Sequence, residues 1–178
     1  MHVETIAHSL DVPTMLYNIP QMVKTVIEPE TVSRLANSQE IIGIKDSSGD
    51  MIRFQQFLRI QNAHQSFSVY QGAEALAALS IMRGARGAVL GLANVAPQLC
   101  VDLFQAARSG NVEEAWALQE RLMALWKLYT HGQWLPCLKA AVTQLGICQP
   151  HATAPFQPLS DDQISRIMQH MEDTGVLS

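Results

Sequence analysis

Short apolar runs alternate with amphipathic stretches along the first part of the chain. Polar or glycine-containing turns bound these runs, which is typical of buried strands. Strands that alternate with helices pair in parallel through right-handed crossovers, so the pattern predicts an α/β sheet. The four expected strands end at Tyr17, Lys45, Tyr70 and Leu90.

Helical patterns fill the intervals between the expected strands and most of the chain beyond them. Pro29 suits the first turn of one helix, and Asp50 suits the N-cap of another. After Gly110 the alternation stops and only helical spacing remains. We therefore expect two parts, residues 1–109 with the strands and residues 110–178 with helices alone. The expected helices are residues 1–10, 29–35, 51–60, 73–82, 97–108, 111–129, 135–145 and 160–172.

Lys45 stands at the tip of the second expected strand. The apolar run Ile41–Ile44 delivers this lysine to the strand end, and the polar turn 46–50 follows at once. A poorly solvated lysine favours its neutral amine, and a neutral amine attacks carbonyl groups and forms Schiff bases. The alternative is an ordinary lysine whose charged end reaches water.

Tyr17 ends the preceding strand, where Pro20 stops the apolar run. In one parallel sheet, Tyr17 and Lys45 would lie at the carboxyl ends of consecutive strands. Sheets and barrels of the α/β class place their chemistry at that end. A tyrosine beside a Schiff-base lysine can carry protons to and from the carbinolamine.

Composition and charge narrow the classes of partner. Hydrophobic residues make up 48% of the chain and charged residues 16%, which allows a sizeable core. The net charge of −4 argues against nucleic acid or an anionic membrane as the main partner. No apolar stretch reaches the length of a membrane span and no secretory signal is visible, so we expect a cytoplasmic protein.

Cysteine and histidine show no pattern typical of a metal site. Cys100, Cys137 and Cys148 are odd in number and lack ligand spacing, so we interpret them as reduced thiols. The six histidines are scattered along the chain. We expect neither a metal nor a dissociable cofactor.

Three motifs stand in order along the chain: Tyr17–Pro20, Gly43–Asp50 and Gly84–Val89, the last followed by residues 93–95. Together they resemble the dihydrodipicolinate synthase / N-acetylneuraminate lyase family, and the resemblance covers essentially the whole chain. Members of that family are complete (β/α)8 barrels of about 250 residues with a helical extension. The resemblance implies that residues 1–109 form the C-terminal half of a TIM barrel, strands 5 to 8, before a helical C-terminal subdomain.

The resemblance also implies a class I aldolase or lyase that acts on pyruvate or a related 2-oxo acid and an aldehyde. Lys45 would form the imine and Tyr17 would relay protons, without a metal or cofactor. Gly72 matches a glycine whose backbone approaches the bound keto acid, with a simple turn as the alternative. Val89 matches a position whose backbone carbonyl faces the Schiff base, and its side chain is expected in the core.

Ser47 and Ser48 follow the lysine and are candidates for binding substrate hydroxyls, or else they cap the next helix. Dihydrodipicolinate synthases carry an arginine where this chain has Met22, and N-acetylneuraminate lyases a serine where it has Gly91. These departures favour a 2-keto-3-deoxy sugar acid or 4-hydroxy-2-oxoglutarate aldolase-like activity. Dihydrodipicolinate synthase and N-acetylneuraminate lyase remain the alternatives.

A half barrel has two unpaired edge strands and an open apolar face. We therefore expect a homo-oligomer, or pairing with an N-terminal half that holds the first four βα units. That half would hold the Gly-Thr-Thr-Gly segment of the proton relay. The rival hypothesis is a truncated, catalytically inactive half barrel that acts only by association. Met1 is either a native start or the first residue of a fragment.

Overall fold

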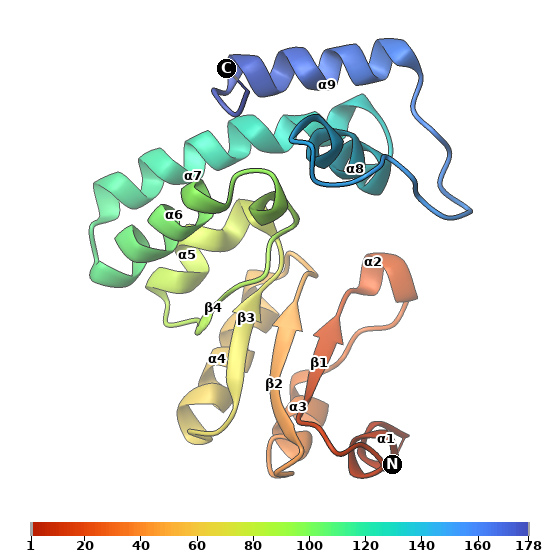
Figure 1. Cartoon of the computed structure of the whole chain (residues 1–178). Helices are drawn as coiled ribbons and strands as arrows, with labels where there is room; N and C mark the ends of the chain where they lie inside the picture. The colour runs from red at the N-terminus through yellow and green to blue at the C-terminus, as the bar shows by residue number, and fades with distance from the viewer. Residues whose placement is uncertain (1, 178) are drawn as a thin grey trace. The chain divides into compact units, whose positions relative to one another are not determined.

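Strands and helices alternate in the first half of the chain and helices follow in the second (Figure 1). The computed structural model describes residues 2–177, so Met1 of the first expected helix lies outside the described residues. The strands are β1 Thr14–Asn18, β2 Ile41–Asp46, β3 Ser68–Gln71 and β4 Gly87–Ala88. The α-helices are α1 His2–His8, α2 Pro20–Val23, α3 Pro29–Leu35, α4 Met51–Ala63, α5 Ala77–Met82, α6 Pro97–Ser109, α7 Val112–Trp126, α8 Trp134–Gln144 and α9 Asp161–Asp173. Short 3-10 helices are η1 Glu74–Leu76, η2 Gly91–Asn94 and η3 Lys127–His131.

The chain divides into two compact units, Met1–Val89 and Leu90–Ser178. This division comes earlier than the boundary expected between residues 109 and 110. Helix α6 packs against α7, and the turn between them is built from Gly110, with a φ of +79°, and the N-cap residue Asn111. The alternating pattern assigns α6 to the strands that precede it, whereas its packing partner is the helix that follows.

The first unit is built on a parallel sheet with the strand order β1-β2-β3-β4. In its register, Tyr17 pairs with Lys45, Lys45 with Tyr70, and Tyr70 with Gly87. The parallel α/β sheet predicted from the sequence is thus confirmed. Its carboxyl edge carries Tyr17 and Lys45 side by side.

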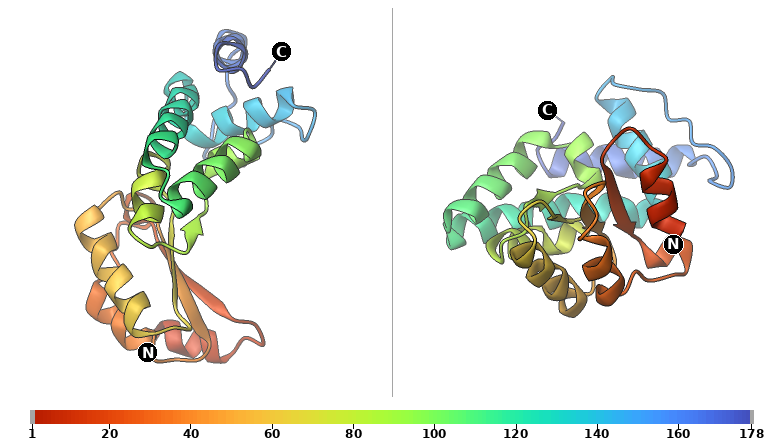
Figure 2. Two further views of the ribbon diagram at one scale, coloured as in Figure 1. Left: turned by 90° about the vertical axis from the view of Figure 1, so that its left-hand side faces the viewer. Right: turned by 90° about the horizontal axis from the view of Figure 1, so that it is seen from below.

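Helices α3 and α4 cover one face of this sheet (Figure 2). Apolar side chains from both layers fill the space between sheet and helices, because each strand turns alternate residues toward the helices. Phe54 and Phe57 of α4 are fully buried there, against a sheet that contributes Leu16, Ile44 and Val69. This core holds the strand ends in fixed positions.

Two strand expectations need correction. Ile42 is 38% exposed rather than buried, because the register between β1 and β2 shifts and leaves this residue without a partner in β1. The last strand ends at Ala88 instead of Leu90. The Val89 N–H still donates to the Gln71 carbonyl at 2.8 Å, but the chain then turns into η2.

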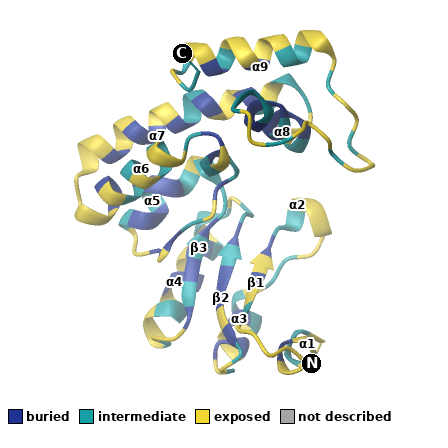
Figure 3. Ribbon diagram, in the orientation of Figure 1, coloured by how far each residue is buried: buried dark blue, intermediate teal, exposed yellow. Residues whose placement is uncertain are grey.

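The expected helix 73–82 begins as the 3-10 helix η1, and the expected helix 111–129 ends at Trp126, where η3 takes over. Within the second unit, buried and exposed positions alternate around α7 and α9, as amphipathic helices require (Figure 3). Helix α9 begins with a capping box of Ser160 and Gln163. Among residues 2–177, the helices are too short or too polar to cross a membrane.

Candidate active site

Tyr17 and Lys45 meet at the carboxyl edge of the sheet. They are register partners on neighbouring strands, and the Lys45 Nζ donates a hydrogen bond to the Tyr17 Oη at 3.2 Å. The same Nζ lies 4.3 Å from the centre of the tyrosine ring. The phenol is half-exposed, so a small molecule can reach both groups from the open side of the sheet.

Ser47 adds a second hydroxyl to this pair. Its Oγ donates to the Tyr17 Oη at 3.4 Å, and its backbone N–H donates to the Asn18 carbonyl at 2.9 Å. The backbone bond prolongs the pairing of β1 and β2 beyond the last strand residue. Lys45, Tyr17 and Ser47 therefore form a short polar chain above the strand ends.

Gly72 lies directly against the lysine. A Cβ atom at this position would overlap the Ser47 Oγ and would come within 2.8 Å of the Lys45 Cε. The Gly72 N–H is already used, because it donates to the Asp46 carbonyl at 2.7 Å and to the Gln71 Oε1 at 2.9 Å. The absence of a side chain at Gly72 therefore allows Lys45 and Ser47 to take the positions that they have.

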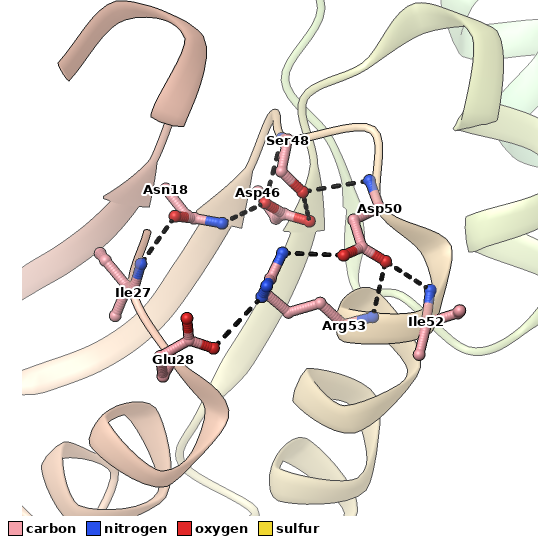
Figure 4. A network of polar contacts seen from close by, with 8 residues as sticks. All are labelled: Asn18, Ile27, Glu28, Asp46, Ser48, Asp50, Ile52 and Arg53. Carbon is pink, nitrogen blue, oxygen red and sulfur yellow. Dashed lines mark hydrogen bonds and ion pairs between the residues drawn. The ribbon is translucent and has the colours of Figure 1, made fainter. Parts of the chain in front are cut away.

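Ser48 is placed differently from its neighbour Ser47. Its hydroxyl donates to the Asp46 Oδ2 at 3.0 Å and accepts from the Asp50 N–H at 3.1 Å (Figure 4). Asp50 in turn accepts from two amides at the start of α4. The Ser48 hydroxyl is therefore engaged in the turn that caps the next helix, which favours the capping alternative for this residue.

Val89 is the first residue after β4, the strand that pairs with β3. Its side chain is 49% exposed, so the expectation of a core side chain is wrong. Its backbone N–H is held by Gln71, which orients the peptide at the carboxyl edge of the sheet.

Sequence reasoning missed two sets of residues. Tyr70 lies in the same register row as Tyr17 and Lys45. Asn18, Asp46 and Gln71 are buried one position further along each strand, on the opposite side of the sheet. The sequence signal that could have identified these buried residues is that each is a polar residue directly after Tyr17, Lys45 or Tyr70 at a strand end.

The described residues contain no cluster of side chains suited to bind a metal ion. From residue 2 to residue 177, no three His, Cys, Asp or Glu side chains gather so that they could hold a metal ion.

Comparisons with known proteins place these features in a family context. Residues 1–174 match the model of the Dihydrodipicolinate synthetase family. A 4-hydroxy-tetrahydrodipicolinate synthase of Pseudomonas putida is 34% identical over 99% of this chain and 60% of its own length. A protein of the same name from Methanopyrus kandleri is 31% identical, over 99% of this chain and 59% of its own length.

Solved structures give the same result. Dihydrodipicolinate synthase from Bacteroides thetaiotaomicron is 34% identical with a TM-score of 0.90, over 97% of this chain and 59% of that protein. A prophage protein of this family from E. coli K12, solved in complex with pyruvate, is 26% identical with a TM-score of 0.91, over 99% of this chain and 60% of that protein. The likeness confirms the expected fold, a partial barrel followed by helices. The chain spans about 60% of the length of the curated relatives.

Proposed function

Because the chain belongs to the dihydrodipicolinate synthetase family, we propose that it carries the Schiff-base centre of a pyruvate-dependent lyase. Lys45 forms the imine, and Tyr17 exchanges protons with the reacting atoms. The observation that carries this proposal is the 3.2 Å hydrogen bond between the Lys45 Nζ and the Tyr17 Oη. A general acid or base must lie within such a distance of the proton that it moves.

The chemistry begins with the neutral amine of Lys45. Its nitrogen lone pair attacks the carbonyl carbon of pyruvate, and the carbonyl oxygen takes up a proton to give a carbinolamine. Loss of that hydroxyl as water leaves a protonated imine. The Tyr17 hydroxyl is placed to supply and remove these protons, and Ser47 adds a further hydroxyl next to the phenol.

The protonated imine then draws electrons from the neighbouring carbon. Loss of a proton from the pyruvate methyl group gives an enamine, and the enamine forms a carbon–carbon bond to an aldehyde. The reverse sequence cleaves a 4-hydroxy-2-oxo acid into pyruvate and an aldehyde. Gly72 lets the side chains of Lys45 and Ser47 pack against the backbone, because a Cβ there would overlap the Ser47 Oγ and come within 2.8 Å of the Lys45 Cε.

The names of the relatives support a condensation of the 4-hydroxy-tetrahydrodipicolinate synthase type as the first candidate. Sequence reasoning kept this reaction as an alternative. The second candidate is a sugar acid or 4-hydroxy-2-oxoglutarate aldolase. It is favoured by Met22, a half-exposed thioether at the position where the synthases carry an arginine. A thioether cannot form a bidentate pair with a carboxylate.

The test is borohydride reduction of the full chain in the presence of pyruvate, read by intact mass and peptide mapping. We expect a pyruvyl adduct on Lys45, absent in Lys45→Ala and in Lys45→Arg, which keeps the charge but lacks the amine. Absence of an adduct on folded wild-type protein would overturn the proposed function for this chain. Pyruvate consumption with aspartate semialdehyde, glyoxylate or glyceraldehyde then separates the two candidates.

We propose in addition that the sheet acts in an assembly, either of identical chains or with a complementary half barrel. Strands β1 and β4 each have a strand neighbour on one side only among the described residues. Met15 on β1 and Val89 directly after β4 are large exposed apolar residues. Unpaired strand edges of this kind favour pairing with another chain. Light scattering across a concentration series tests the assembly of identical chains, and a strictly monomeric chain would leave only pairing with a complementary half barrel.

A further inference from the structure

Two buried polar residues lie directly behind the Tyr17–Lys45 pair. Asn18 is 0% exposed and Asp46 1%, and the two are register partners at the ends of β1 and β2. We infer that Asn18 and Asp46 are positioning residues that set the separation of the Tyr17 hydroxyl and the Lys45 amine. The inference rests on the proposed function, in which those two groups exchange a proton.

The position of the pair follows from strand geometry. Successive residues of a strand point to opposite faces, so Tyr17 and Lys45 face the open side while Asn18 and Asp46 face the helices. The Asn18 Nδ2 donates to the Asp46 Oδ1 at 2.7 Å. One register step therefore separates a reactive pair on one face from a hydrogen-bonded pair on the other.

Each remaining bond of this pair holds a turn beyond the strands. The Asn18 Oδ1 accepts from the Ile27 N–H at 3.0 Å, across the segment that leads from α2 to α3. Asp46 accepts from the Ser48 N–H through Oδ1 at 3.1 Å and from the Ser48 hydroxyl through Oδ2 at 3.0 Å. Figure 4 shows these bonds converging on Asp46.

The donors to Asp46 are an amide, a backbone N–H and a hydroxyl. The neighbouring guanidinium of Arg53 pairs instead with Asp50 at 2.8 Å and with Glu28 at 3.6 Å. A buried carboxylate is tolerated when directed hydrogen bonds replace its water shell. Asp46 is therefore held by hydrogen bonds of fixed direction, as expected of a residue that sets the distance between the Tyr17 hydroxyl and the Lys45 amine.

The third strand provides an internal comparison. Gln71 occupies the same register row on β3, next to Asp46, and is equally buried. Its amide bonds to Ser80 of α5 and to the turn at Gly72 and Ala73. The side-chain bond across strands thus joins the two strands that carry Tyr17 and Lys45.

The test compares rates of pyruvate-dependent borohydride trapping across a set of variants. Asn18→Asp places two carboxylates face to face, so we expect the maximal rate to fall by about tenfold or more, with a smaller change in the half-saturating pyruvate concentration. The double variant Asn18→Asp/Asp46→Asn restores a bond of opposite direction and should recover part of that rate. Asn18→Ser serves the same comparison if Asn18→Asp does not fold.

A double-mutant cycle separates positioning from general destabilisation. In a Tyr17→Phe background, Asn18→Asp should reduce the trapping rate much less than it does in the otherwise wild-type chain, because its effect on the rate depends on the Tyr17 hydroxyl. Equal costs in the two backgrounds, or a wild-type rate in folded Asn18→Asp, would overturn the inference. Val32→Ala truncates a buried side chain of α3 and should lower the unfolding temperature. Its effect on the trapping rate should not depend on the Tyr17 hydroxyl.

A failure of the proposed function can be distinguished from a failure of the positioning inference. A wild-type chain that forms no pyruvyl adduct would overturn the imine chemistry. Positioning would then be read from acetylation of Lys45 by acetic anhydride, relative to Lys127 and Lys139. Asn18→Asp should change that ratio and Val32→Ala should not. An unchanged ratio in Asn18→Asp would overturn the inference in that case as well.

Discussion

Gly72 and Lys45 are in such close contact that a single added carbon would displace the lysine. A Cβ on Gly72 would come within 2.8 Å of the Lys45 Cε, well inside van der Waals contact, and would overlap the Ser47 Oγ. Relief of this overlap shifts the side chains of Lys45 and Ser47, which are the two groups that donate to the Tyr17 hydroxyl.

Gly72→Ala should therefore reduce the rate of imine trapping by at least about tenfold, since small displacements of reacting groups are costly. Gly87→Ala is the matched control. Its Cβ would meet the Tyr70 ring at 3.4 Å, an ordinary contact, so trapping should persist. Equal trapping rates in the two variants would contradict the steric argument. Intact mass after a short borohydride pulse measures both.

Tyr17→Phe removes the hydroxyl that accepts from Lys45 and from Ser47 while it keeps the ring under the amine. Proton transfer by a positioned side chain contributes about 100-fold or more to a rate, so imine formation should slow by that order. The unfolding temperature should stay near the wild-type value, because the phenol is half-exposed. A variant that traps pyruvate at the wild-type rate would remove Tyr17 from the proposed relay.

The core between sheet and helices should dominate the stability of the first unit. Phe54→Ala deletes a fully buried ring and should lower the free energy of unfolding by about 3–5 kcal/mol. Ile52→Ala lies two residues away on the same helix, at a position that is 77% exposed, and should cost less than about 0.5 kcal/mol. Urea unfolding followed by circular dichroism compares the two, and similar midpoints would contradict the described packing.

His131 should make the second unit sensitive to acid. Burial lowers the pKa of its imidazole, and the facing His170 and Arg166 lower it further. The unfolded chain then binds a proton more readily than the folded one, so this contribution to stability is complete above about pH 6.5. It is lost as the pH falls through the lowered pKa of the folded state.

His131→Gln should flatten the decline in unfolding temperature below about pH 6.5, because glutamine does not titrate. Parallel curves for the wild type and the variant would show that His131 contributes nothing to the acid response.

Much of the fold was predictable because each strand is a local apolar run and because α4, α7 and α9 carry their own N-cap residues. Asp50 and Ser160 cap the helices that follow them, as their position in the sequence predicts. The register shift at Ile42 was not predictable, since it depends on how β2 meets β1. The division near Val89 likewise depends on α6 packing against α7.

The site was predictable to the extent that chemistry shows in residue type. Lys45 and Tyr17 carry reactive groups at strand ends, so sequence reasoning found them. Asn18 and Asp46 have ordinary polar side chains, and only their burial and the 2.7 Å bond between them support the proposed positioning role. Ser47 and Ser48 have the same side chain, and only the turn geometry distinguishes them.

Tyr17 and Lys45 are each followed by a buried polar residue, and this arrangement affects which positions of the sequence can change during evolution. In the proposed function, the residues that meet the substrate and the residues that hold the strands are neighbours in sequence, yet they occupy opposite faces of the sheet. Ser47 and Tyr70 can therefore change while Asn18 and Asp46 continue to fix the architecture. A mutant library that varies the open face alone should yield new aldehyde preferences on an unaltered scaffold.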